Sequence, residues 1–68
     1  MENKNQNPPV TLLKASEVAE SLNISKAFAY KLMNQGTIPS VQIGYAKRVR
    51  PQDLHEFIRN NLSGDTHR

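Results

Sequence analysis

The sequence predicts a small, mainly α-helical domain with one β-hairpin, in the order helix, turn, helix, hairpin, helix. Apolar residues recur at helical spacing in three segments, and a stretch of strand-like alternation lies between the second and the third. A chain of 68 residues holds at most one domain. Because it contains no cysteine, neither a disulfide nor a cysteine-based zinc site can support its small core. We expect the folded domain to span 11–62, between a disordered N-terminal tail at 1–10 and a flexible C-terminal tail at 63–68.

The first helix is predicted over Ala15–Leu22 and is followed by a tight turn. Its apolar residues share one helical stripe at positions i, i+3, i+4 and i+7: Ala15, Val18, Ala19 and Leu22. Asn23 tolerates the left-handed backbone that such a turn requires. Ile24, the lone apolar residue of the turn, should point inward, and Ser25 should cap the next helix.

The second helix is predicted over 26–35, because Gly36 and then Pro39 end the pattern. Its inner face should hold Ala29, Leu32 and Met33, with Phe28 at one edge.

The hairpin and the third helix follow. Residues 38–43 and 47–50 alternate as strands do, around a predicted tip at 44–46, and Val49 should point into the core. Pro51 suits the first turn of a helix, and Asp53 suits the positive end of the helix dipole. The expected buried stripe of this third helix is Leu54, Phe57, Ile58 and Leu62.

Positive charge is concentrated in the middle of the chain. Residues 26–50 contain five basic and no acidic side chains, namely Lys26, Lys31, Lys47, Arg48 and Arg50. The segments on either side each carry a small excess of acid. Such a block is typical of a surface that binds a polyanion, although a solvated surface with clustered lysines is the alternative.

Two helices joined by a three-residue turn can project the second helix into the major groove of duplex DNA. The sequence therefore predicts a winged helix-turn-helix, with an ordinary helical hairpin as the alternative. The expected recognition-helix residues are Ser25, Lys26, Ala27, Tyr30, Lys31 and Asn34. The expected wing residues are Gly44, Tyr45, Lys47, Arg48 and Arg50. Lysine and arginine bind phosphates or guanine edges, asparagine pairs with adenine, and a basic hairpin can lie along a minor groove.

Two of these assignments have plain structural alternatives. Tyr30 is equally well explained as a half-buried packing residue, and the tip of the hairpin as a solvated loop. Asn34 shares its predicted adenine contact with Gln35, which could also be a solvated residue of the last turn.

Catalysis finds no support in the sequence. We see no nucleophile-base-acid spacing, no glycine-rich phosphate loop and no cluster of metal ligands, so we expect no enzyme, no cofactor and no small-molecule substrate. No apolar run has the length of a membrane span, and Met1–Asn7 is too polar for a signal peptide. We therefore expect a cytoplasmic, nucleoid-associated protein of a bacterium or phage.

The segments Leu12–Ser25, Ala29–Met33, Gly36–Pro39, Val41–Gly44, Arg48–Arg50 and Asp53-Leu54 together resemble the excisionase family, small winged helix-turn-helix proteins related to the MerR-like DNA-binding domain. The resemblance covers about Leu12–Ile58. It implies a recognition helix at 26–35, a wing at 44–48 and cooperative binding to repeated DNA sites. It also implies bending of the DNA and a tyrosine integrase as partner, which is steered toward excision.

The sequence departs from the family pattern at three places. Lys14 stands where Ser or Thr usually caps the first helix, so we expect that end to fray or to start later. Asn23 replaces a common glycine, and Tyr45-Ala46 replaces two frequent basic residues at the tip of the wing. A small transcriptional regulator of a mobile element is the alternative role, and a protein-interaction module that uses the third helix is the least favoured class.

Overall fold

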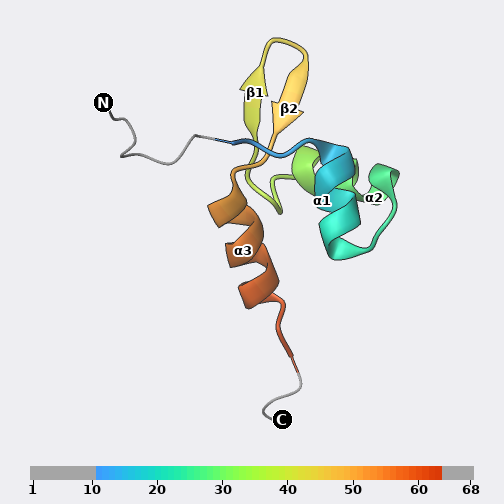
Figure 1. The fold of residues 1–68 in the computed structure, drawn as a ribbon, viewed down its shortest axis with the longest axis vertical. Coiled ribbons are helices and arrows are strands. Elements are labelled where there is room, and N and C mark those ends of the chain that lie inside the picture. The colour runs from blue at the N-terminus through green and yellow to red at the C-terminus, as the bar shows by residue number, and fades with distance from the viewer. Residues whose placement is uncertain (1–10, 64–68) are drawn as a thin grey trace, which may run out of the picture.

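The computed structural model describes residues 11–63 and contains three helices and one antiparallel hairpin (Figure 1). The elements are α1 (Ala15–Leu22), α2 (Lys26–Asn34), β1 (Val41–Ile43), β2 (Ala46–Arg48) and α3 (Pro51–Asn60). The predicted order of elements is confirmed, and the architecture is a helix-turn-helix with a hairpin wing. The predicted tails lie outside the described residues, apart from Ser63.

Helix α1 begins at Ala15 as predicted, so the expected later start was wrong. Lys14 has no side-chain acceptor for the free N–H groups of the first turn. The carboxylate of Glu17 instead accepts a hydrogen bond of 2.7 Å from the Lys14 backbone N–H. This contact is half of a capping box, and it stabilises the helix start without a Ser or Thr cap.

The turn between α1 and α2 has the predicted geometry. Asn23 has a φ of 59°, in the left-handed region, and the Ile24 N–H donates to the Ala19 carbonyl over 2.9 Å. Ile24 packs against the core, which confirms its inward orientation. Ser25 caps α2, because its hydroxyl oxygen accepts from the Phe28 N–H at 3.0 Å.

Helix α2 ends one residue earlier than predicted, with Gln35 as its C-cap and Gly36 at a φ of 77°. Ile38, which was predicted to begin a strand, is instead fully buried, and its N–H donates to the Leu32 carbonyl at 3.2 Å. Strand β1 starts only at Val41. The strand prediction at 38–40 was wrong because the alternating pattern does not distinguish a strand from a single residue that fills the core.

The hairpin is short, with Val41 opposite Arg48, Gln42 opposite Lys47, and Ile43 opposite Ala46. Because Ala46 is paired, the tip consists of two residues, Gly44 and Tyr45, rather than the three predicted. Gly44 has a φ of 60°, the conformation of a type II′ hairpin turn, in which the first central residue is usually glycine.

Directly after β2, Val49 is fully buried and exchanges backbone hydrogen bonds of 2.8 and 2.9 Å with Leu13. This bridge attaches the base of the hairpin to the segment that enters α1, as the crossing chains in Figure 1 show. A two-stranded hairpin by itself is only marginally stable in water, so this connection to the core stabilises the wing.

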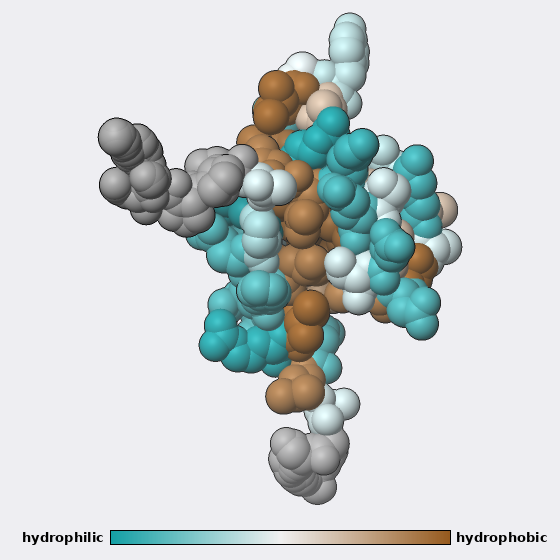
Figure 2. All heavy atoms as spheres, in the orientation of Figure 1, coloured by the Kyte–Doolittle hydropathy of each residue, from teal (hydrophilic) through white to brown (hydrophobic). Residues whose placement is uncertain are grey.

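Helix α3 presents a narrower apolar face than predicted. Leu54 is buried and Phe57 packs against the core, but Ile58 and Leu62 are exposed. Leu62 lies beyond the end of the helix at Asn60, so it does not share the predicted stripe. Figure 2 shows the resulting strip of hydrophobic surface running from the hairpin toward α3.

The core lies where α1, α2, the chain around the hairpin and α3 converge. Its buried residues are Ala15, Val18, Ala19, Ala29, Met33, Ile38, Val49 and Leu54. Three of these are alanines on α1 and α2, which lets the two helices approach closely and fixes their relative orientation.

Candidate nucleic-acid interface

The outer face of α2 carries the side chains that the sequence assigned to a recognition helix. Ala29 and Met33 face the core, so the helix turns its other side to solvent. All six predicted residues are exposed there: Ser25, Lys26, Ala27, Tyr30, Lys31 and Asn34. Tyr30 is 43% exposed and is not one of the side chains that pack against the core, so the structure does not support the alternative of a half-buried packing residue.

The N-terminus of α2 offers free backbone donors. Ser25 satisfies the N–H of Phe28, and the Ser25 carbonyl accepts from the N–H of Ala29 at 3.0 Å. The first N–H groups of the helix have no intrahelical acceptor, and they lie at the positive end of the helix dipole. A phosphate oxygen is a suitable acceptor for such groups, and Lys26 at the first helical position adds a full positive charge.

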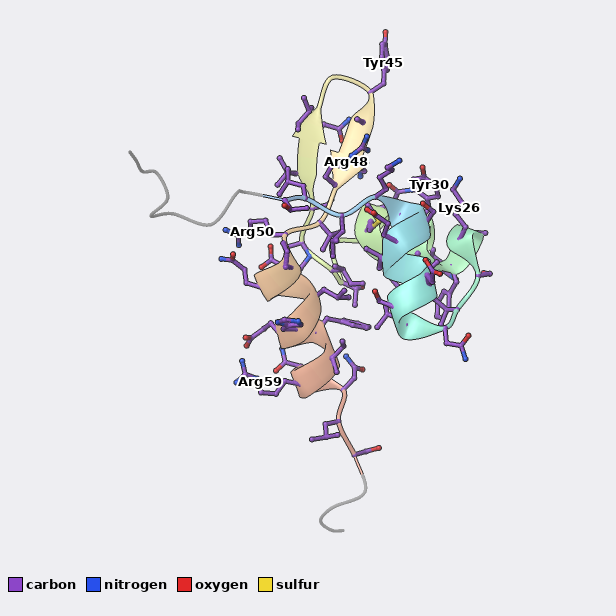
Figure 3. All side chains as sticks on the ribbon, in the orientation of Figure 1. Lys26, Tyr30, Tyr45, Arg48, Arg50 and Arg59 are labelled. Atoms are coloured by element: carbon purple, nitrogen blue, oxygen red, sulfur yellow. The ribbon has the colours of Figure 1, made fainter. Side chains whose placement is uncertain are left out.

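The wing carries a cationic strand below its tip. Gly44 and Tyr45 are exposed at the tip, while Lys47 and Arg48 are half-buried along β2. The Arg48 guanidinium donates to the Lys47 carbonyl at 2.9 Å, which holds it close to the strand. In Figure 3, Tyr45 projects from the top of the hairpin and Arg48 lies below it.

One hydrogen bond connects the wing to α2. The ammonium group of Lys47 donates to Asn34 Oδ1 over 2.8 Å, so β2 lies beside the last turn of α2. This bond links the two halves of the predicted interface, whose residues we together call the α2–wing surface: Ser25, Lys26, Ala27, Tyr30, Lys31, Asn34, Gly44, Tyr45, Lys47 and Arg48.

The same bond limits what Asn34 can do. Bidentate recognition of adenine uses both the carbonyl oxygen and the amide nitrogen of an asparagine. With Oδ1 accepting from Lys47, the amide N–H₂ of Asn34 remains available as a donor to an acceptor on a base or a phosphate. The predicted adenine contact of Asn34 stays a prediction, and it requires Lys47 to move.

Arg50, the remaining predicted wing residue, lies at the start of α3. Its guanidinium forms two hydrogen bonds with the Asp53 carboxylate, at 2.6 and 3.0 Å. Hydrogen bonding and charge attraction from Arg50 lower the pKa of Asp53, and the same pair raises the pKa of Arg50. Figure 3 places Arg50 beside α3, on the other side of the molecule from Lys26 and Tyr30. Its contact with DNA stays a prediction, in competition with this ion pair.

The charge distribution within residues 11–63 separates this surface from the rest of the molecule. The acidic side chains there are Glu17 and Glu20 on α1 and Asp53 and Glu56 on α3. None of them forms an ion pair with Lys26, Lys31, Lys47 or Arg48, whereas Arg59 pairs with Glu56 at 3.0 Å. The α2–wing surface thus carries four cations with no acid of residues 11–63 against them, which suits a polyanionic ligand.

Two structural features of the site were missed in the sequence. The Lys47–Asn34 bond joins residues far apart in the chain, so no local signal predicts it. The Arg50–Asp53 pair has the i, i+3 spacing of neighbours at a helix start, and this spacing was a usable signal.

An apolar groove of about 340 Å³ lies among the end of α1, α2 and α3. It is lined by Leu22, Ile24, Phe28, Leu32, Thr37, Phe57 and Asn61, none of which is ionisable. Within residues 11–63 there is no group of three or more His, Cys, Asp or Glu side chains that could hold a metal ion. The helices of residues 11–63 have at most ten residues each, so none of them meets the requirements of a membrane span.

Comparison with known proteins agrees with this architecture. Two relatives from Mycobacterium tuberculosis are "Putative DNA-binding protein MT0521" of strain CDC 1551 / Oshkosh and "Putative DNA-binding protein Rv0500A" of strain ATCC 25618 / H37Rv. Each is 30% identical over 56 residues, which cover 82% of this chain and 72% of the relative. No solved structure matches the chain. The family described as "Helix-turn-helix domain" matches residues 12–62, which include all five secondary-structure elements, and the chain belongs to this family.

Proposed function

We propose that the protein binds double-stranded DNA in a sequence-specific manner through the α2–wing surface. The observation that carries this proposal is the Lys47–Asn34 hydrogen bond, which joins a cationic hairpin to the exposed face of α2. Helix α2 then enters the major groove, and the wing reaches the neighbouring phosphates and minor groove. The relatives named as DNA-binding proteins support the same ligand.

Within this interface we assign some residues to phosphate contacts and others to base contacts. Lys26, the N–H groups at the start of α2 and Lys47 bind phosphates and fix the position of the helix. Lys31, in the middle of the exposed face, binds a further phosphate, and Tyr30 beside it reaches the edges of the bases, where sequence is read. A module of this size buries only about 600–1,000 Å² on DNA, so we propose that neighbouring molecules bind cooperatively to repeated sites.

The proposed biological role is that of an excisionase, a recombination directionality factor. In this role the protein binds and bends DNA near attachment sites, and a tyrosine integrase is its partner. The resemblance over Leu12–Ile58 supports this role. A small transcriptional regulator would use the same surface, so the two roles must be separated by an assay rather than by the fold.

The test begins with selection of bound duplexes from a random library, followed by location of the enriched sequence in the genome that encodes the protein. We expect clustered sites beside a tyrosine integrase gene, and we expect added protein to stimulate excision of an attachment-site plasmid by that integrase. Enriched sites at a promoter, with a changed reporter signal and no effect on excision, would instead assign the regulator role. Failure to enrich any duplex sequence would refute the proposed function.

A further inference from the structure

The tip of the wing carries hydrophobic side chains that the fold does not use. Tyr45 is fully exposed, and Ile43, two residues before it, is 56% exposed. Figure 2 shows hydrophobic surface on the hairpin just below the tip, and in Figure 3 the Tyr45 ring extends beyond the ribbon, away from the body of the protein. Exposed apolar side chains of this size at the end of a cationic hairpin indicate a ligand that has both phosphates and an apolar interior.

The tip is held in a defined conformation. Gly44 takes the left-handed φ of the turn, and the Ile43–Ala46 pair closes it. The side-chain amide of Gln42 donates to the Gly44 carbonyl at 2.7 Å, which adds a bond across the turn. The backbone of Tyr45 is therefore held by a tight turn rather than by a long loop, and its fully exposed ring projects from that turn.

Two contacts connect the hairpin to the rest of the fold. Lys47 connects β2 to Asn34, and the Leu13–Val49 bridge holds the base of the hairpin. When α2 occupies a major groove, a hairpin attached at its last turn extends across the sugar-phosphate backbone toward the adjacent minor groove. Lys47 and Arg48 accompany the ring there, and cations favour the negative potential of that groove.

The width of the minor groove limits which part of the hairpin can enter it. The minor groove of B-form DNA is about 6 Å wide. Two strands about 4.8 Å apart, with side chains on both sides, are too broad to lie flat within it. A single ring projecting from the apex is narrow enough to enter, and minor-groove proteins insert apolar side chains between base steps in this way.

We infer that Tyr45 is an apolar wedge that enters the minor groove, stacks against the bases and kinks the duplex, with Ile43 covering the opened step. This inference rests on the proposed function and adds to it the residue that bends the DNA. Insertion of a wedge unstacks a base step and bends the duplex by about 20–90°. Cytosine-adenine and thymine-adenine steps deform most easily, so we expect such a step at the position of the wing.

The experiment compares the wild-type protein with Tyr45→Ala, Tyr45→Phe and Lys47→Ala on one selected duplex. Energy transfer between dyes at the duplex ends reports bending, 2-aminopurine at the wing position reports unstacking, and the salt dependence of affinity reports phosphate contacts. Tyr45→Ala should abolish the bend and the 2-aminopurine signal and should weaken binding about 5- to 150-fold, the range for loss of one aromatic–base stack. Its salt dependence should equal that of the wild type.

The other two variants distinguish the contribution of the aromatic ring from those of the Tyr45 hydroxyl group and of the phosphate contacts. Tyr45→Phe keeps the ring and should bend DNA as the wild type does, whereas Lys47→Ala should reduce the salt dependence by about one phosphate contact. A normal bend with Tyr45→Ala would overturn the wedge. The wedge would also be overturned if Tyr45→Phe reduced bending and affinity as much as Tyr45→Ala does, since the hydroxyl group would then make the contact. If the wild-type protein bound no duplex at all, the proposed function itself would fail.

Discussion

Replacement of Lys31 by alanine tests the electrostatic basis of the α2–wing surface. Lys31 lies on the exposed side of α2, and no acidic side chain of residues 11–63 pairs with it. Removing its ammonium group should therefore remove one phosphate contact without disturbing the core. The melting temperature should stay within a few degrees of the wild-type value, because exposed substitutions change stability by less than about 0.5 kcal/mol.

The expected salt dependence of DNA affinity follows from the number of cations on the α2–wing surface. Each phosphate contact contributes a slope of about 0.9 to the dependence of log affinity on log salt concentration. Lys26, Lys31, Lys47 and Arg48 together predict a slope of about 3.6, so affinity should fall about 150-fold between roughly 50 and 200 mM salt. With Lys31→Ala the slope should be about 2.7, and the fall about 40-fold.

Fluorescence anisotropy with a labelled duplex, measured at several salt concentrations, provides the assay. Arg59→Ala is the matched control, because Arg59 pairs with Glu56 on α3, away from the α2–wing surface. We expect this control to keep the wild-type slope. An unchanged slope with Lys31→Ala, or an equal reduction with Arg59→Ala, would refute the assignment of the surface.

Three further predictions concern the fold. Ile38→Ala should lower the free energy of unfolding by about 2–5 kcal/mol in urea titrations, because Ile38 is fully buried, whereas the exposed Ile43→Ala should cost less than about 1 kcal/mol. Ser25→Ala should cost about 1 kcal/mol through loss of the α2 cap, and an unchanged urea midpoint would contradict that role. The lowered pKa of Asp53 stabilises the fold above the unfolded pKa of about 3.9, and this contribution is lost as pH falls through the folded value. Asp53→Asn should therefore flatten the acid side of the stability profile, as should Arg50→Gln, and an unaltered profile in both variants would refute the pair.

The helices were predicted well because the residues that determine a helix and its ends lie close together in the sequence. The helical spacing of Ala15 and Val18, the turn at Asn23 and the cap at Ser25 each depend on residues within one or two helical turns. The structure confirms all three features. Helix α1 keeps its predicted start at Ala15 because Glu17 replaces the missing cap, which is why the expected delay of that start was wrong. This interaction is also local, and the i, i+3 spacing of Lys14 and Glu17 could have predicted it.

The wrong predictions concern residues whose burial depends on tertiary packing. Ile38 resembles the start of a strand in sequence, but the core accepts its side chain, and Pro39 at the next position cannot donate to a ladder. Ile58 has correct helical spacing, yet α3 meets the core along a stripe too narrow to cover it. The apolar pattern indicates which residues can be buried, whereas the neighbouring elements determine which residues are.

The candidate interface shows the same division. The exposed residues of α2 follow from helix periodicity alone, and the basic block predicts its charge. The register that leaves Tyr45 at a two-residue tip, and the contact between Lys47 and Asn34, arise only when the chain is folded. For this reason the sequence predicts the members of the surface but not the contact between its two halves.

Chemical-shift mapping with a selected duplex tests the central claim most directly, since it reports every backbone amide at once. The account predicts perturbations along α2 from Lys26 to Asn34 and along the wing from Gly44 to Arg48, with the amide of Arg59 on α3 unchanged. Shifts confined to α3, or no shifts with any duplex, would contradict it.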